Sequence, residues 1–415
     1  MKTWILYTGS ILFGFAATLL LGEWQPYVSF ITFMVPMVKD ISLFLLFPIV
    51  FILFTAESAS LRRHKDAPML FFTTVLWSLL TTIILSFSAM GLSLLIPESL
   101  TQFTEVASQE VPVLTSISFE GIRTLLFSNN AFTQFTRSTT SLLPLLVVAA
   151  IIGYALKPDY EGLRPAYVVS NSFAEVMMRL SRILTHLAAI ALFFLSANIS
   201  MQNPLVMSLY EALPISLLYI AVVLVSLILI LPFVFALVTG FKKGNPYRIL
   251  FNSFASIVTS FFYMSTLEST ISMIALGENN SNVKKRVAGT AFPLYTIIGK
   301  GGSAMVATFT LLLIFKNNGS TELTLIPLLL VALFASLVSL VSSFVPRFEV
   351  LFIMMFTFSG LFGSTLQTPG AFIILLFPFI QGLAAMIDSS IAILGAAFTS
   401  RVISEDQKTP YHQIM

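Results

Sequence analysis

The amino-acid sequence predicts an all-α membrane protein with about eight transmembrane helices and two re-entrant helical hairpins of opposite orientation. The first reason is composition, because 57% of the 415 residues are hydrophobic and only 10% are charged, whereas about a quarter of a soluble domain is charged. The second is the length of the apolar runs, most of which can cross a bilayer. The third is the charge of the loops, which alternates until residues 249–276 break the pattern.

Composition and motif content exclude several classes of function. The chain has no cysteine, so it offers neither a thiol nucleophile nor a Cys-based metal site. His64, His186 and His412 lie far apart and show no metal-ligand spacing. No phosphate-binding loop, zinc-protease or serine-hydrolase motif is present. We therefore expect no enzyme and no cofactor, and the net charge of +3, which resides in loops, predicts no nucleic-acid partner.

Six apolar segments in the first part of the chain can each cross a bilayer, which takes a helix of roughly 20 residues. Lys and Arg gather after the second, fourth and sixth segments, and Glu residues follow the third. Because basic loops favour the cytoplasmic side, both termini are predicted inside the cell membrane and the loop 96–138 outside. The first segment is predicted to be a span, since no cleavage pattern follows it. The segments are residues 4–21, 29–60, 68–95, 139–156, 167–199 and 211–239.

Residues 249–276 form a seventh apolar segment that does not fit a single crossing. One crossing would place the basic triplet at 284–286 outside, and two crossings would need about twice as many apolar residues. The middle of the segment is polar, with Ser265, Thr266 and Glu268 close together. A re-entrant hairpin from the cytoplasm satisfies both length and charge, and such a tip points to a binding site.

The rest of the chain repeats this order. A clean span is predicted over residues 287–315 and a last span over 370–400. Between them, residues 325–363 fit either a second re-entrant hairpin or two full crossings with a tight turn. With a hairpin here, the second half of the chain consists of two units, each a hairpin followed by a helix, and the two hairpins enter the membrane from opposite sides. This arrangement is typical of an inverted-topology repeat. The polar interruption of this segment consists of Ser339, Ser342, Ser343, Pro346 and Arg347.

Four short motifs follow one another at positions that agree with this topology. They are FPIVF at 47–51, Ser265-Thr266, FPL at 292–294 and SLVSSFVP at 339–346. In order and spacing they resemble the glutamate transporter family, the dicarboxylate/amino-acid:cation symporters, over most of the chain. The family counterparts are MPIVF in the second span, a serine-rich first hairpin tip, TLPL at the start of the seventh helix, and SIGTAGVP at the second tip.

The resemblance implies an elevator-type secondary transporter that assembles as a homotrimer in the lipid bilayer. Residues 1–247 would form mainly the scaffold of spans one to six, with the third and sixth spans open to either part. Residues 248–403 would form a transport domain of two hairpins and two helices, and residues 404–415 a cytoplasmic tail. The implied cargo is a small solute, an amino acid or a dicarboxylate, coupled to a cation.

Two motifs of the family are replaced in this chain. Residues 299–303 are GKGGS where the family has NMDGT, so the Asn and Asp that serve sodium binding are absent and Lys300 replaces the methionine. In the eighth helix, Asp388 occupies the place of a substrate-reading Asn and is the one strong polar group retained. The other matching positions hold Gln381, Ala384, Ala385 and Ala392. The resemblance therefore does not carry over sodium coupling or carboxylate recognition by an arginine of that helix.

The predicted site combines the two hairpin tips with the charges of the last helices. Charges at membrane depth are costly unless they are paired, so we expect them to cluster. Lys300 is predicted to replace a bound sodium ion and to balance Asp388, with Ser303 in the same ion site, which leaves Na⁺ or H⁺ as the coupling cation. Arg347 is predicted to bind a substrate carboxylate. The predicted substrate-binding residues are Ser265, Thr266, Glu268, Ser342, Ser343, Arg347 and Asp388.

Other interpretations of these residues stay open. Lys300 and Asp388 would also serve as a plain ion pair between two helices, and Arg347 as part of a solvated turn. Ser and Thr at the tips would also serve as caps of half-helices. Two functions compete with a secondary transporter: an anion channel or passive pathway, and a non-transporting paralogue that acts as a receptor.

Overall fold

The computed structural model describes residues 3–97, 142–157, 159–202, 209–241, 244–281, 283–317, 325–342 and 370–403. All regular secondary structure in these ranges is helical, which confirms the predicted all-α class. Most of the loop 96–138, the second hairpin tip with Ser343 and Arg347, and the tail 404–415 lie outside the described residues.

The helices follow the predicted spans closely. Seven helical segments of the described chain are long and apolar enough to cross a membrane. The first part contains α1 (Thr3–Leu21), α2 (Gln25–Arg63), α3 (Ala67–Leu94), α6 (Leu143–Ala155), α7 (Arg164–Gln202), α8 (Leu209–Val225), the π-helix η3 (Ser226–Ile230) and α9 (Leu231–Val238). The second part contains α10 (Pro246–Asn252), α11 (Phe254–Tyr263), α12 (Thr266–Ser281), α13 (Lys285–Ile298), α14 (Gly301–Asn317), α15 (Leu325–Ser342) and α17 (Gly370–Val402).

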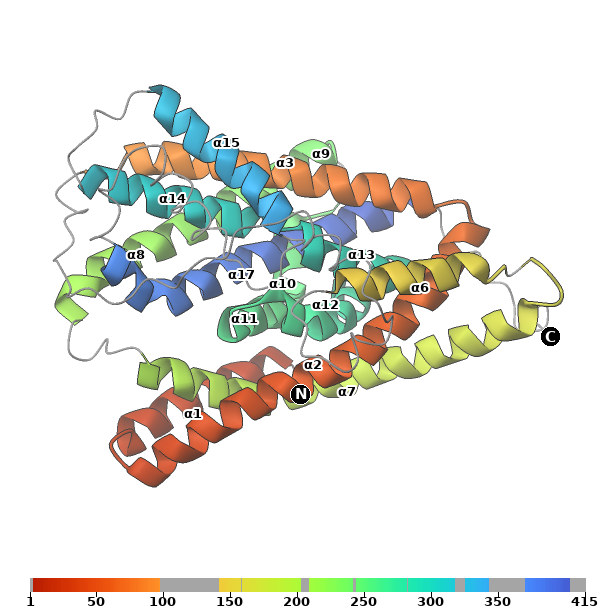
Figure 1. Cartoon of the computed structure of the whole chain (residues 1–415), viewed down its shortest axis with the longest axis horizontal. Helices are drawn as coiled ribbons and strands as arrows, with labels where there is room; N and C mark the ends of the chain where they lie inside the picture. The colour runs from red at the N-terminus through yellow and green to blue at the C-terminus, as the bar shows by residue number, and fades with distance from the viewer. Residues whose placement is uncertain are drawn as a thin grey trace.

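Helix α17 runs through the centre of the described structure (Figure 1). On one side it packs against α14, which also contacts α3 and α15, and on the other side it packs against α11 and α12. Helices α7, α2 and α1 lie beyond α11 and α12, and α7 contacts α12. Burial agrees with the central position of α17. In its most apolar stretch 89% of the residues are buried, whereas in that of α1 only 17% are.

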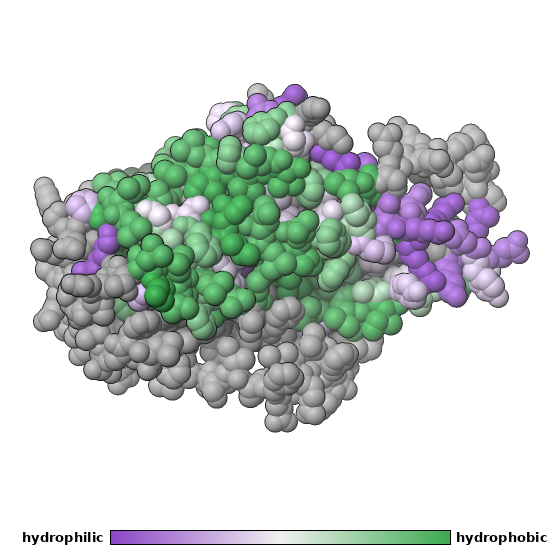
Figure 2. All heavy atoms as spheres, turned by 90° about the horizontal axis from the view of Figure 1, so that it is seen from above, coloured by the Kyte–Doolittle hydropathy of each residue, from purple (hydrophilic) through white to green (hydrophobic). Residues whose placement is uncertain are grey.

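The surface separates into an apolar band and a polar end (Figure 2). Large apolar side chains such as Leu20, Phe13 and Phe44 are exposed in the described chain, which fits a surface in contact with lipid. The hydrophilic side chains gather where α2 ends and α7 begins in Figure 1. We call this the basic end; its described cations include Arg62, Arg63, Lys65, Lys157, Arg164, Lys284, Lys285 and Arg286.

The segment predicted as the first re-entrant hairpin is a helical hairpin. Helices α11 and α12 meet at a tight turn in which Met264 has a φ of 58°, a left-handed conformation that ends α11. At the other end the two arms lie side by side, because Asn252 and Asn280 exchange side-chain-to-carbonyl hydrogen bonds of 2.7 and 3.0 Å. Ser253 and Ser281 add a hydroxyl pair at 2.8 Å.

The lengths of the arms explain why the hairpin returns to the side from which it starts. Helix α11 has 10 residues and α12 has 16, which span about 15 and 24 Å, so each is shorter than a hydrocarbon core of about 30 Å. The chain then continues directly into the basic end, where Arg286 contacts Asp66 at 3.3 Å. Both ends of the hairpin therefore lie at the basic end, as the loop charges predict.

The span predicted over residues 287–315 is present, since Lys285–Lys316 is long and apolar enough to cross a membrane, but it is not one continuous helix. The segment is broken into α13 and α14 by two non-helical residues, Gly299 and Lys300. Glycine costs about 1 kcal/mol relative to alanine inside a helix, and three glycines flank the lysine. In addition, the first N–H groups of α14 donate to a side chain of α17 instead of to the preceding turn, so the break is stabilised by a tertiary contact.

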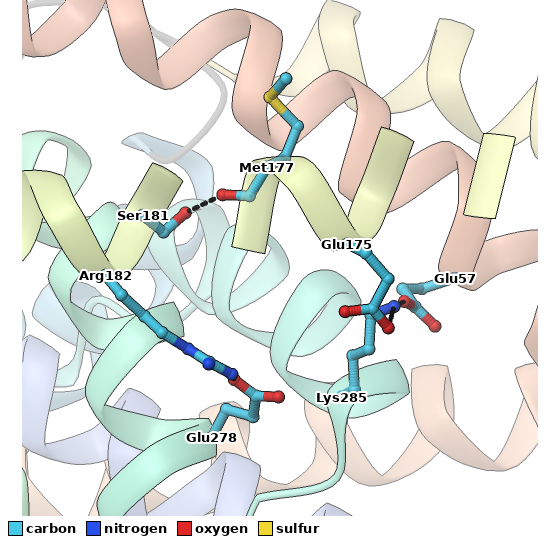
Figure 3. Close-up of polar contacts among 7 residues, drawn as sticks. All are labelled: Glu57, Glu175, Met177, Ser181, Arg182, Glu278 and Lys285. Atoms are coloured by element: carbon cyan, nitrogen blue, oxygen red, sulfur yellow. Dashed lines mark hydrogen bonds and ion pairs between the residues drawn. The ribbon is translucent and has the colours of Figure 1, made fainter. Parts of the chain in front are cut away.

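A set of ion pairs at the basic end joins α2 and α7 to the second half of the chain (Figure 3). Lys285 at the start of α13 lies 2.7 Å from Glu175 on α7 and 3.5 Å from Glu57 on α2. Arg182 on α7 lies 2.7 Å from Glu278 on α12. The Glu57 side chain is only 3% exposed, and a charge buried to this extent needs a partner, which Lys285 provides.

Candidate functional site

The break between α13 and α14 receives the carboxylate of Asp388 from the middle of α17. Its Oδ1 accepts hydrogen bonds from the backbone N–H of Gly302 at 2.6 Å and of Ser303 at 3.4 Å. Its Oδ2 accepts from the Ser303 hydroxyl at 2.9 Å. Asp388 is 2% exposed, so these groups replace the water that a carboxylate otherwise requires.

This arrangement is a helix cap supplied from another helix. The first N–H groups of a helix have no partner within it, and the helix dipole places partial positive charge at the same end. A carboxylate at that point gains both charge-assisted hydrogen bonds and favourable electrostatics. Asp388 therefore fixes the start of α14 against α17 at membrane depth.

Gly302 makes this approach possible because it has no side chain. A Cβ at this position would overlap the Ala384 carbonyl oxygen and lie 2.7 Å from the Cβ of Ile387. We expect Gly302→Ala to separate α14 from α17, to weaken the hydrogen bonds to Asp388 and to lower the melting temperature of the protein in detergent. Gly91→Ala on α3 is the matched control, since a Cβ there would meet nothing within 4 Å. Equal melting temperatures for the two variants would contradict the close contact.

Lys300 occupies the break itself and points toward the first hairpin. Its Nζ donates to the Thr266 hydroxyl at 3.4 Å, and its backbone carbonyl accepts a hydrogen bond from Ser339 on α15. Lys300 forms no ion pair with Asp388 in the described part of the chain, yet its ammonium is close enough to attract that carboxylate. The two charges therefore attract each other without direct contact, and the start of α14 is the direct partner of Asp388.

The hairpin tip divides its polar residues between two faces. The Ser265 hydroxyl accepts from the Leu267 N–H at 3.0 Å and caps the start of α12, the alternative role that the sequence allows for this residue. Thr266 is buried and faces Lys300, and one turn later Thr270 shares a hydroxyl pair of 2.8 Å with Thr296 on α13. These contacts fix the tip to the broken helix.

Glu268 lies on the opposite face of the tip. Two residues along a helix turn the side chain by about 200° relative to Thr266, and Glu268 lines a cavity between the hairpin and helices α2 and α7. The structure thus brings together Thr266, Lys300, Ser303 and Asp388, and it places Glu268 apart from them. Ser342 ends α15 and its side chain is not described, while Ser343 and Arg347 lie outside the described residues.

Several residues at the break are absent from the predicted site. Ser339 donates a hydrogen bond to the Lys300 carbonyl. Thr82 on α3 lies beside Gly301, because a Cβ added at Gly301 would be 3.2 Å from the Thr82 Cα. The hydroxyls of Ser78 and Thr82 are buried and have no hydrogen-bond partner among the described residues. A sequence signal for α3 exists, because its buried hydroxyl residues recur with helical spacing: Thr74, Ser78, Thr81, Thr82 and Ser86.

The charged residues of the site do not form a ligand set for a transition metal. In the described ranges, no group of three or more His, Cys, Asp or Glu side chains could hold a metal ion. The polar groups at the break are instead one carboxylate, one ammonium and hydroxyls, which suit ion pairing and hydrogen bonding with a small polar molecule.

Comparison with known families agrees with this architecture. The family model described as "Sodium:dicarboxylate symporter family" matches residues 6–405, nearly the whole chain. This match confirms the resemblance inferred from the four motifs. None of the curated protein sequences compared with the chain matches it.

Proposed function

Because the chain belongs to the sodium:dicarboxylate symporter family, whose members are secondary transporters and not enzymes, we propose that it uses Lys300 as a fixed cation in place of bound sodium. The transported solute is an amino acid or a dicarboxylate. It binds between the tip of the first hairpin and the break of α13 and α14.

The position of Lys300 supports this proposal. An ammonium carries one positive charge and three N–H donors, and Thr266 is its hydrogen-bond acceptor among the described residues. The remaining donors suit the carboxylate that amino acids and dicarboxylates share. The same charge attracts Asp388, so Lys300 supplies at once the neutralisation that a bound cation would supply and an attachment point for an anionic solute.

The packing supports an elevator mechanism in which residues 248–403 move against the first helices. Each of α11, α12, α13 and α14 packs on α17, and α12 also packs on α11 and α13. Helix α3 packs on both α14 and α17, so we assign α3 to the moving part. The ion pairs Lys285–Glu57, Lys285–Glu175 and Arg182–Glu278 cross the boundary between the two parts. Movement of one part against the other requires these ion pairs to break, so the pairs stabilise the arrangement seen in this structure.

The membrane orientation and the assembly are part of the same proposal. Basic residues favour the cytoplasmic side, so we assign the basic end, and with it both chain termini, to the cytoplasm of the cell. The exposed apolar band offers surface both to lipid and to neighbouring subunits, in accord with a homotrimer held together by the scaffold.

We expect a solute of this class to raise the melting temperature of the purified protein equally with and without sodium. A ligand at 100 times its Kd stabilises the folded state by about 2.7 kcal/mol, which a thermal melt detects easily. The measurement is a panel of amino acids and dicarboxylates, at two pH values, in sodium and in potassium buffers of equal ionic strength.

Each result of the panel has a distinct meaning. A shift that appears only in sodium contradicts the role of Lys300, and a flat response across the panel favours the non-transporting paralogue. For a solute that does shift the melt, saturable counterflow in proteoliposomes is expected, whereas a channel would conduct without counterflow.

A further inference from the structure

A second polar feature lies on the face of the hairpin tip that is turned away from Lys300. Helices α2 and α7 and the hairpin α11–α12 form a cavity of about 290 Å³, just below the range of about 300 to 1,000 Å³ typical of ligand sites. Its walls are mostly aliphatic, with residues such as Val38, Leu184 and Ile271. Glu268, in the first turn of α12, contributes the one carboxylate of the lining.

The Glu268 carboxylate has an acceptor that the walls do not satisfy. Its Oε2 is buried and has no hydrogen-bond partner in the described part of the chain. The Tyr263 hydroxyl is paired with that of Ser42 at 2.8 Å. The serine and threonine hydroxyls of the lining each donate to a carbonyl of their own helix. They are those of Ser42, Thr185, Thr259 and Ser272. No described residue of the lining donates to Glu268 Oε2, so a molecule that enters the cavity can supply this donor.

The cavity opens toward an exposed apolar surface of α2 and α7. Three of its lining residues are also strongly exposed: Ile41 at 46%, Leu187 at 52% and Ile190 at 59%. A molecule that reaches Glu268 by this opening lies against apolar side chains over most of its length. A bare inorganic cation would find one carboxylate where divalent ions require about six or more oxygen ligands.

We propose that this cavity binds the ammonium group of an apolar amine. The ammonium donates to Glu268, and its hydrocarbon chain lies along Leu187 and Ile190. An ammonium meets the need of a partly buried carboxylate for both a counter-charge and a donor. The site is separate from the proposed solute site, because Thr266 and Glu268 point to opposite faces of α12. The same chemistry is available from a free alkylamine or from an ethanolamine lipid headgroup.

The test is a thermal melt of the full-length protein in nanodiscs of phosphatidylcholine, a lipid whose headgroup carries no N–H donor. n-Octylammonium is expected to raise the melting temperature by a few degrees in a saturable manner, and n-octanol, which has the same chain without the charge, is not. Glu268→Gln should abolish the response. Ala188→Leu, which fills the cavity from α7 and leaves Glu268 in place, should abolish it as well.

Other arms of the experiment separate the possible sources and failures. Lys300→Met should keep the octylammonium response, so a failed solute site and a failed amine site are distinguishable. If exchange of phosphatidylcholine for phosphatidylethanolamine stabilises the wild type but not Glu268→Gln, the lipid is the source of the ammonium. Equal stabilisation by n-octanol, no saturable response to n-octylammonium, or a response that survives in both cavity variants overturns the proposal.

Discussion

Replacement of Lys300 by methionine is expected to reduce solute uptake into proteoliposomes by about 10- to 100-fold, because a hydrogen bond to a charged group contributes about 1.5 to 3 kcal/mol. Methionine keeps a long unbranched side chain but removes the charge and the donor to Thr266. It also leaves Asp388 without the nearby positive charge. If residual uptake remains in the variant, it should have gained dependence on sodium, since a free cation would then be needed at the break.

Uptake of a solute that shifts the melt of the wild type is the appropriate measurement, in sodium and potassium and at two pH values. Lys316→Met is the matched control, because Lys300 directly precedes α14 and Lys316 lies at the far end of that helix, about 24 Å away along its axis. There its Nζ contacts the carbonyls of Ser93 and Ile96, so this variant should keep uptake. Unchanged uptake and pH dependence in Lys300→Met would exclude the fixed-cation role.

The first hairpin could be predicted from the sequence because it depends on two global constraints. The segment 249–276 is too short for two crossings, and the cations at 284–286 exclude one crossing. Both constraints are independent of neighbouring helices. The Asn252–Asn280 contact, which places the two arms at one level, has no such sequence signal.

The break between α13 and α14 and the orientation of Glu268 could not be predicted in the same way. The run GKGG is visible at 299–302, but the group that stabilises the break, Asp388, lies 86 residues from Gly302 in sequence. Similarly, the opposite faces of Thr266 and Glu268 follow from helical spacing. Which face meets Lys300 and which meets α7 depends on packing between distant helices.

Asp388→Ala is expected to lower the stability of the folded protein more than any other single change at the site. The substitution removes the acceptor for Gly302 N–H, Ser303 N–H and the Ser303 hydroxyl at a buried helix start. Each buried donor left without a partner costs about 1 to 3 kcal/mol. Lys300 in addition loses the carboxylate that attracts it, so a fall of the melting temperature by several degrees is expected.

Graded variants separate the cap from the charge. Ser303→Ala removes one of the three hydrogen bonds and should cost about 1 kcal/mol. Asp388→Asn keeps the size and one acceptor oxygen but removes the charge, so its effect should lie between those of Ser303→Ala and Asp388→Ala. Asp159→Asn is the control, because the ion pair of Asp159 with Arg63 is exposed, and such pairs contribute about 0 to 1 kcal/mol.

The double variant Lys300→Met/Asp388→Asn tests whether the two charges stabilise each other. If they do, each single variant leaves an uncompensated charge at membrane depth, which is costly, and the double variant leaves none. The double variant should then be destabilised by less than the sum of the single effects, with a coupling of about 0.5 to 3 kcal/mol. The comparison needs melts at one scan rate and one protein concentration, because membrane proteins often unfold irreversibly. Strict additivity would mean that α14 alone holds the Asp388 carboxylate, and that Lys300 is available in full to the solute.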